Sequence, residues 1–223
     1  MIRKVLVPLD GSSFAVQALG PALEIVERAG AALELVHVCD PEMIDPGLAD
    51  LELSLEQGVR RYLEEVREEI LESRDIPVEV RVPTGSIVDA LVDEVGERDV
   101  DLAVLSTHGR GPLSRIWMGR VADRFVRRAP CPVLSVRPRD EPDPPGPGAR
   151  FEMEHLLVPL DGSEIGDTVL EHAADLARLF QARITLFSSV WLPQHVSAEY
   201  LPHAEWVDRD ALMEDRAKSA RTR

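Results

Sequence analysis

Two copies of one heptapeptide decide the fold of this chain: they are Leu6-Val7-Pro8-Leu9-Asp10-Gly11-Ser12 and Leu157-Val158-Pro159-Leu160-Asp161-Gly162-Ser163. A helix-like stretch follows each copy. A second strand-like run then occurs in the same register, at residues 33–36 and again at 184–187. Two copies are too few for a solenoid. We therefore interpret the repeat as a duplicated domain.

A segment rich in proline and glycine separates the two copies. Residues 139–150 contain four prolines and two glycines, a composition that forms neither helix nor strand. We predict a domain over residues 1–138, a semi-rigid linker over 139–150, and a second copy over 151–223. The second copy is expected to be incomplete, because nothing after residue 190 matches the later strands of the first copy.

The first copy alternates strand-like and helix-like segments. Strands are expected at residues 5–7, 33–38, 77–82, 101–105 and 133–136. Helices are expected from Ser12 or Ser13 to Ala29, and at residues 51–71, 86–95 and 119–128. Strands that alternate with helices indicate an α/β, Rossmann-like fold, in which helices cover both faces of an open parallel sheet.

Charge and cysteine content limit the function classes. The formal net charge of −15 disfavours nonspecific binding to nucleic acid or to an anionic membrane. The two cysteines, Cys39 and Cys131, are too few for a disulfide framework, and we expect buried or half-buried thiols. The sequence contains no run of 18 apolar residues, so it predicts no membrane-spanning helix. The cytoplasm is the expected compartment.

Two loops at the carboxyl ends of strands carry residues suited to a ligand. Asp10 follows the first strand, where a carboxylate can accept hydrogen bonds from ribose hydroxyls, although the same residues also suit a plain turn and helix cap. The loop from Ser106 to Arg120 offers glycines and arginines, which suit an anion. If the first and fourth strands are neighbours, both loops flank one crevice. We therefore predict a nucleotide site there.

The first motif, the order of the elements and the segment 106–134 together resemble the universal stress protein family. The resemblance covers about residues 3–138, and residues 154–190 as a second start. It implies a five-stranded parallel sheet in the order 3-2-1-4-5. In nucleotide-binding members it also implies a phosphate loop of Gly, two residues, Gly, nine residues, Gly, then Ser or Thr. At these four positions the chain has Ser106, Gly109, Gly119 and Arg120.

The resemblance also implies which residues would surround the ligand, an adenine nucleotide (ATP with Mg²⁺). Those residues are Pro8, Leu9, Asp10, Val38, Leu105, Ser106, Gly109, Arg110, Gly119, Arg120 and Val121. No catalytic residue and no protein metal ligand is assigned, so at most slow ATP hydrolysis is expected of a stress-response regulatory protein. Arg120 stands where a hydroxyl is usual. It can pair with phosphate, or its bulk can fill the site.

Other readings of the same fold remain open. The chain can act as a dimerisation or interaction module without a nucleotide, if Arg120 closes the site. The resemblance implies a homodimer through the edge strand Val133–Val136. An adenylating ligase is disfavoured, because the loop after the first strand has one glycine, Gly11, instead of a Ser/Gly-rich run. A receiver domain is disfavoured too, because Pro83-Thr84-Gly85 follows the third strand where a phospho-acceptor aspartate would be needed.

Overall fold

The computed structural model describes residues 1–43, 49–107, 119–138, 150–161 and 163–188. The chain divides into two compact units, Met1–Glu152 and Met153–Arg223, and each is described by itself. Residues 139–149 of the expected linker lie outside the described residues, so the linker remains a prediction.

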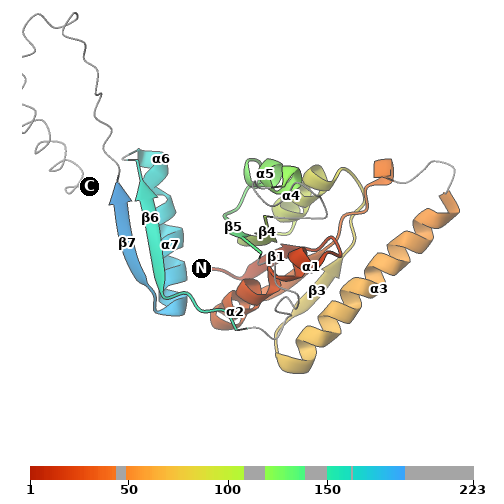
Figure 1. The fold of residues 1–223 in the computed structure, drawn as a ribbon, viewed down its shortest axis with the longest axis horizontal. Coiled ribbons are helices and arrows are strands. Elements are labelled where there is room, and N and C mark those ends of the chain that lie inside the picture. Colours follow the sequence, from red (N-terminus) through yellow and green to blue (C-terminus); the bar gives the residue numbers. More distant parts are fainter. Residues whose placement is uncertain (44–48, 108–118, 139–149, 162, 189–223) are drawn as a thin grey trace, which may run out of the picture. The chain divides into compact units, whose positions relative to one another are not determined.

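The first unit is built on a parallel sheet in the order β3-β2-β1-β4-β5 (Figure 1). Its strands are β1 (Lys4–Pro8), β2 (Ala32–Val36), β3 (Val78–Arg81), β4 (Leu102–Ser106) and β5 (Val133–Val136). Every pairing in it is parallel. The predicted fold class and strand order are therefore confirmed.

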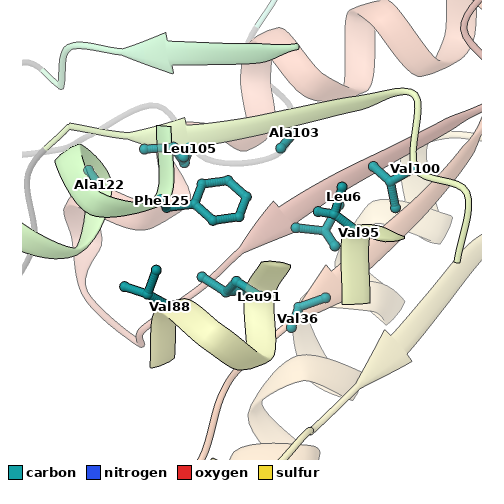
Figure 2. Close-up of a cluster of buried hydrophobic side chains, with 10 residues drawn as sticks. All are labelled: Leu6, Val36, Val88, Leu91, Val95, Val100, Ala103, Leu105, Ala122 and Phe125. Carbon is teal, nitrogen blue, oxygen red and sulfur yellow. The ribbon is translucent and has the colours of Figure 1, made fainter. Parts of the chain in front are cut away.

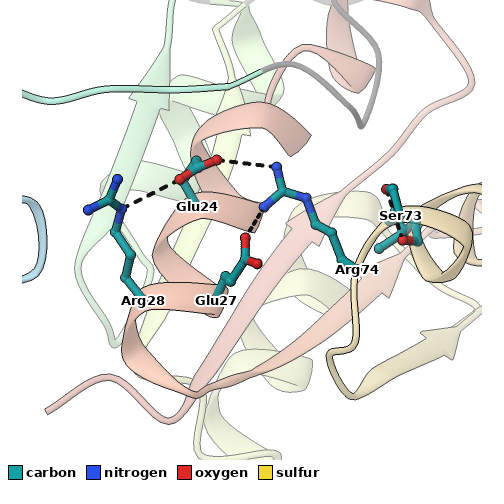
Figure 3. Close-up of polar contacts among 6 residues, drawn as sticks. Glu24, Glu27, Arg28, Ser73 and Arg74 are labelled. Carbon is teal, nitrogen blue, oxygen red and sulfur yellow. Dashed lines mark hydrogen bonds and ion pairs between the residues drawn. The ribbon is translucent and has the colours of Figure 1, made fainter.

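Helices connect the strands and cover both faces of this sheet. They are α1 (Ser13–Val16), α2 (Leu19–Ala29), α3 (Ala49–Ser73), α4 (Ile87–Glu97) and α5 (Arg120–Val126), with a short 3₁₀ turn η1 (Pro41–Met43). At the end of α3, the Arg74 side chain reaches Glu24 and Glu27 on α2 (Figure 3). These contacts hold α2 and α3 together on one face, while α4 and α5 pack on the other.

The first helix differs from its prediction, because it is broken into α1 and α2. Ser12 caps α1 as expected, since its Oγ accepts a hydrogen bond from Ala15 N at 3.1 Å. The chain then tightens, and Ala18 N bonds to Ala15 O at 3.0 Å. Pro21 lies in the first turn of α2. Proline lacks an N–H and its ring clashes with the carbonyl four residues earlier, so the break falls at Gln17.

The core beneath α4 and α5 is mostly aliphatic. Figure 2 shows the ring of Phe125, from α5, among side chains of α4 and of the strands. The other members of this cluster are Leu6, Val36, Val88, Leu91, Val95, Val100, Ala103, Leu105 and Ala122. Phe125 is 1 % exposed. Burial of a side chain of this size contributes about 1.5–3 kcal/mol, which fixes α5 against the sheet.

In its described residues, the second unit has the same order of elements as the beginning of the first. Its elements are β6 (His155–Leu160), α6 (Glu164–Asp167), α7 (Val169–Phe180) and β7 (Arg183–Ser188). The two strands pair in parallel from His155↔Arg183 to Leu160↔Ser188, which agrees with the strand–helix–strand pattern expected from the repeat. Among all the helices described, none is both long and apolar enough to cross a membrane.

Candidate functional site

The candidate site lies at the carboxyl edge of the first sheet, where the strand order reverses. β1 and β4 are hydrogen-bonded neighbours, with Val5 opposite Leu102 and Leu6 opposite Ala103. From β1 the chain continues to β2 on one side, whereas from β4 it continues to β5 on the other. Ligands of open α/β sheets bind at such a switch point. The two strands from whose ends these loops start are therefore neighbours, as the prediction required.

The loop after β1 presents a half-buried carboxylate. Leu9, 2 % exposed, extends the strand by donating its N–H to Val36 O at 2.8 Å. Asp10 Oδ1 then accepts a hydrogen bond from Ser12 N at 2.9 Å. Gly11 has a φ of 76°, a left-handed conformation that favours glycine. Asp10 Oδ1 thus stabilises the turn after β1. No described residue forms a hydrogen bond with the second oxygen, Oδ2, which remains available as an acceptor.

The loop after β4 is closed at its base. Thr107 N donates to Val136 O at 2.9 Å, and Gly119 N donates to Thr107 O at 2.8 Å. Half-buried Ser106 ends β4, and Arg120 begins α5. The intervening residues, which include the predicted Gly109 and Arg110, lie outside the described residues. The fold therefore fixes where this loop leaves β4 and where it enters α5.

The backbone conformation at position 119 does not require a glycine. Its φ of −57° and ψ of 150° are open to any residue. A Cβ built there would lie 3.5 Å from Thr107 O, which is an ordinary contact. The missing side chain instead leaves room beside the first turn of α5.

Two contacts set the position of α5, and with it Arg120 and Val121. One is the burial of Phe125. The other is the ion pair of Arg128 with Asp89 on α4, 2.6 Å from Nη1 to Oδ1. The hydrogen bond from Arg128 lowers the pKa of Asp89 below its usual value. Val121 is 42 % exposed. Arg120 is exposed too, and no described residue forms an ion pair with it.

On the β2 side, the edge is extended by a bridge that the sequence did not predict. Cys39 N donates to Pro83 O at 2.9 Å, and Gly85 N donates to Cys39 O at 3.0 Å. The φ of Gly85 is 146°, a region that L side chains rarely adopt. The glycine just before the predicted helix start at residue 86 was the available signal. The predicted Val38 is half-buried here and packs against the cluster that contains Phe125.

Of the predicted site residues, the structure brings two groups to this edge. The first is Pro8, Leu9, Asp10 and Val38, from the ends of β1 and β2. The second is Leu105, Ser106, Gly119, Arg120 and Val121, from the end of β4 and the start of α5. The described residues contain no cluster of three or more side chains suited to bind a metal ion. Both cysteines are half-buried, as expected, and neither forms a disulfide bond in the described part of the chain.

The structural comparisons show the fold. The universal stress protein UspA from Lactobacillus plantarum has a TM-score of 0.55 at 22 % identity, over 61 % of this chain and 98 % of its own. A Pseudomonas aeruginosa protein, PA1789, has a TM-score of 0.58 at 20 % identity. That alignment covers 98 % of this chain and 70 % of the other, so it includes the second unit.

The sequence comparisons show the family. A universal stress protein from Thermus aquaticus is 31 % identical over 142 residues, which are 61 % of this chain and 100 % of the relative. Universal stress protein MJ0531 of Methanocaldococcus jannaschii is 28 % identical over 142 residues, 61 % of this chain and 83 % of the relative. The sequence model of the universal stress protein family matches residues 1–137 and again residues 152–222. Because both halves of the repeat match, the chain belongs to the universal stress protein family.

Proposed function

We propose that the first unit binds an adenine nucleotide, ATP with Mg²⁺, and that the chain is a stress-response regulatory protein and not a dedicated enzyme. The observation that carries this proposal is the available Oδ2 of Asp10 at the reversal point between β1 and β4. A half-buried carboxylate with a free acceptor oxygen is suited to ribose hydroxyls. The turn alone uses only Oδ1.

The surrounding residues fit the rest of the ligand. Pro8 and Val38 are half-buried apolar residues at the ends of β1 and β2, which suits the adenine ring. Gly119 leaves backbone accessible, and Arg120 offers a cation without an ion-pair partner in the described part of the chain. Guanidinium groups bind phosphate through paired hydrogen bonds. Mg²⁺ is usually held mainly by phosphate oxygens and water, so no protein metal cluster is needed.

The repeat supplies a matched control for the test. Asp161, in the second unit, forms the same turn, accepting hydrogen bonds from Ser163 N at 2.9 Å and from Ser163 Oγ at 2.7 Å. We would titrate ATP with Mg²⁺ calorimetrically into the full chain and into Asp10→Ala, Asp10→Asn and Asp161→Ala. Saturable binding that both Asp10 variants weaken and Asp161→Ala leaves unchanged is expected. Absence of saturable heat with the parent protein at millimolar ATP would overturn the proposal.

A second function rests on β5. This strand pairs with β4 on one side, and no described strand pairs with its other edge. We propose that Val133–Val136 pairs with the same strand of a second copy to form a homodimer. An interaction module of this kind needs no nucleotide, and it becomes the preferred function if ATP does not bind. We also propose the reducing cytoplasm as the compartment, which suits two cysteines that form no disulfide bond among the described residues.

A further inference from the structure

The first sheet ends in two outer strands, β3 on one side and β5 on the other. On β3, the carbonyl oxygens of Pro77 and Arg81 accept hydrogen bonds from β2, at 2.8 Å and 3.1 Å. Alternate residues of a parallel strand bond to the same neighbour, so the backbone groups of Val78 and Val80 point away from β2. These groups form the outer edge of the sheet on this side.

An arginine from α3 occupies this edge. α3 packs against β3 (Figure 1), and Arg67 Nε donates a hydrogen bond to Val78 O at 3.1 Å. Arg67 Nη1 donates to Glu64 Oε2 at 3.0 Å, one turn earlier on the same helix. The guanidinium is therefore held from two sides, with one N–H group on the strand and another on the helix.

In this position the guanidinium stands in the way of an incoming strand. Neighbouring strands lie about 4.7–4.9 Å apart, and a strand that paired with β3 would have to bond to Val78 and Val80. The Arg67 guanidinium already lies on Val78, one of the two outward residues of a four-residue strand. An unpaired edge strand otherwise serves as a template for pairing with another chain. The Arg67 contact therefore opposes such pairing.

The charged side chains of β3 itself do not have this effect. Both point to the α4 face, where Arg98 binds Glu79, and Arg81 Nε lies 3.5 Å from Glu94 Oε2. They lie above the plane of the sheet and leave its edge unoccupied. Among the described side chains, Arg67 alone bonds to an outward backbone group of β3.

The opposite edge of the sheet, on β5, is built differently. Pro132 O and Val136 O accept hydrogen bonds from the β4 side, so the outward backbone groups belong to Val133 and Ser135. No described side chain bonds to these groups. The sheet therefore has one edge that carries an arginine and one edge that does not.

We propose that Arg67 is an autoinhibitory contact, which prevents β3 from pairing with β3 of a second copy and limits self-association through this sheet to the β5 edge. A second copy fits because two identical edges can meet about a two-fold axis. In an antiparallel pair, Val78 of one chain faces Val80 of the other, and both residues have their N–H and C=O groups pointing outward. Two open edges on one chain would permit growth without closure.

Light scattering of the full chain over a range of concentrations tests the proposal. Arg67→Ala should reach about twice the mass of the parent or more, whether the parent is a monomer or a homodimer, with unchanged circular dichroism. Arg67→Ala/Val80→Pro should return to the parent mass, because proline removes an outward N–H and leaves the pairing with β2 intact. Arg60→Ala is the matched control. It removes the same charge from the same helix, where Arg60 pairs with Glu56 at 3.8 Å, and it should keep the parent mass.

Each other outcome overturns the proposal. An Arg67→Ala protein with the parent mass at every concentration would show that the arginine restrains nothing. Assembly that persists in Arg67→Ala/Val80→Pro would come from another surface or from partial unfolding, since the added proline cannot restore a lost fold. Equal assembly of Arg60→Ala would show that the lost charge, and not an opened edge, drives the growth.

Discussion

Arg98 binds Glu34 across 3.4 Å, from Nε to Oε2, although Glu34 is only 1 % exposed in the middle of the sheet. The same guanidinium bonds to Glu79, which is the register partner of Glu34 on β3. One arginine at the end of α4 therefore holds two carboxylates that face each other on neighbouring strands. Glu34 Oε1 is buried, and no described residue forms a hydrogen bond with it.

This arrangement predicts that Glu34 makes stability depend on pH. Burial raises the pKa of Glu34 above its usual value, and the nearby Glu94 adds to the rise, while Arg98 and Lys4 oppose it. The folded protein therefore binds the proton more tightly than the unfolded chain. The resulting stabilisation is complete below the ordinary glutamate pKa and is lost as pH rises through the raised one. Relative to Glu34→Gln, the parent should gain stability on acidification across that window.

Urea unfolding at several pH values measures the effect. We expect the difference in unfolding free energy between the parent and Glu34→Gln to change with pH across this window. A parent that loses stability relative to Glu34→Gln on acidification would contradict the sign of this prediction.

The Glu34 cluster also shows how far the sequence predicts the fold. The repeat and the alternation of segments predict the sheet, because the period of apolar residues reports which segments are half-buried. They do not predict a buried glutamate. Residue 34 lies within a run that indicates a strand, and its partners Glu79 and Arg98 come from distant segments. Side-chain pairing of this kind depends on strand register, which the pattern of one segment does not contain.

The candidate site likewise has some features that the sequence predicts and others that it does not. The position of Asp10 beside the end of β4 follows from the motif and the strand order, and it was predicted. The bridge between Cys39 and Thr84 was not predicted, because it depends on how two loops run past the ends of β2 and β3. Pro21 indicated a break before α2, but the predicted helix continued without one to Ala29.

A second prediction concerns Arg74, which links α3 to α2. Its side chain is 9 % exposed and binds Glu24 at 3.2 Å as well as Glu27 (Figure 3). Arg74→Ala should destabilise the protein by about 1–3 kcal/mol, because it leaves the largely buried Glu24 with one arginine partner fewer. The control is Arg60→Ala, whose ion pair with Glu56 is half-exposed at 3.8 Å and should cost about 0–1 kcal/mol. Equal losses in urea unfolding would refute the distinction.

The proposed dimer edge can be tested by one proline. Pro132 O and Val136 O accept hydrogen bonds from the β4 side. Alternate residues of a parallel strand bond to the same neighbour, so the N–H of exposed Ser135 points away from β4. Ser135→Pro removes an outward donor and should leave the β4–β5 pairing intact. Light scattering should report a dimer for the parent and for Ser135→Ala, and a monomer for Ser135→Pro with unchanged circular dichroism. A monomeric parent at micromolar concentration would count against the dimer.

The last prediction decides what Arg120 does. If its guanidinium pairs with phosphate, Arg120→Ala should weaken ATP binding by about tenfold, which is ~1.4 kcal/mol, and should leave adenosine binding unchanged. Arg124 is the matched control, because it is an exposed arginine one turn later on α5. Arg124→Ala removes the same charge from the same helix. If only the positive potential matters, both variants should weaken ATP binding equally. If Arg120 contacts the phosphate directly, only Arg120→Ala should weaken it.

The salt dependence separates the remaining explanations. A charge pair at an exposed position is screened by added salt, so the parent should lose more ATP affinity than Arg120→Ala as the ionic strength rises. If the bulk of Arg120 instead fills the site, Arg120→Ala and Arg120→Ser should bind ATP more tightly than the parent. Tighter binding in both variants would show that the Arg120 side chain occupies the nucleotide site. The interaction module at the β5 edge would then be the favoured function of the parent protein.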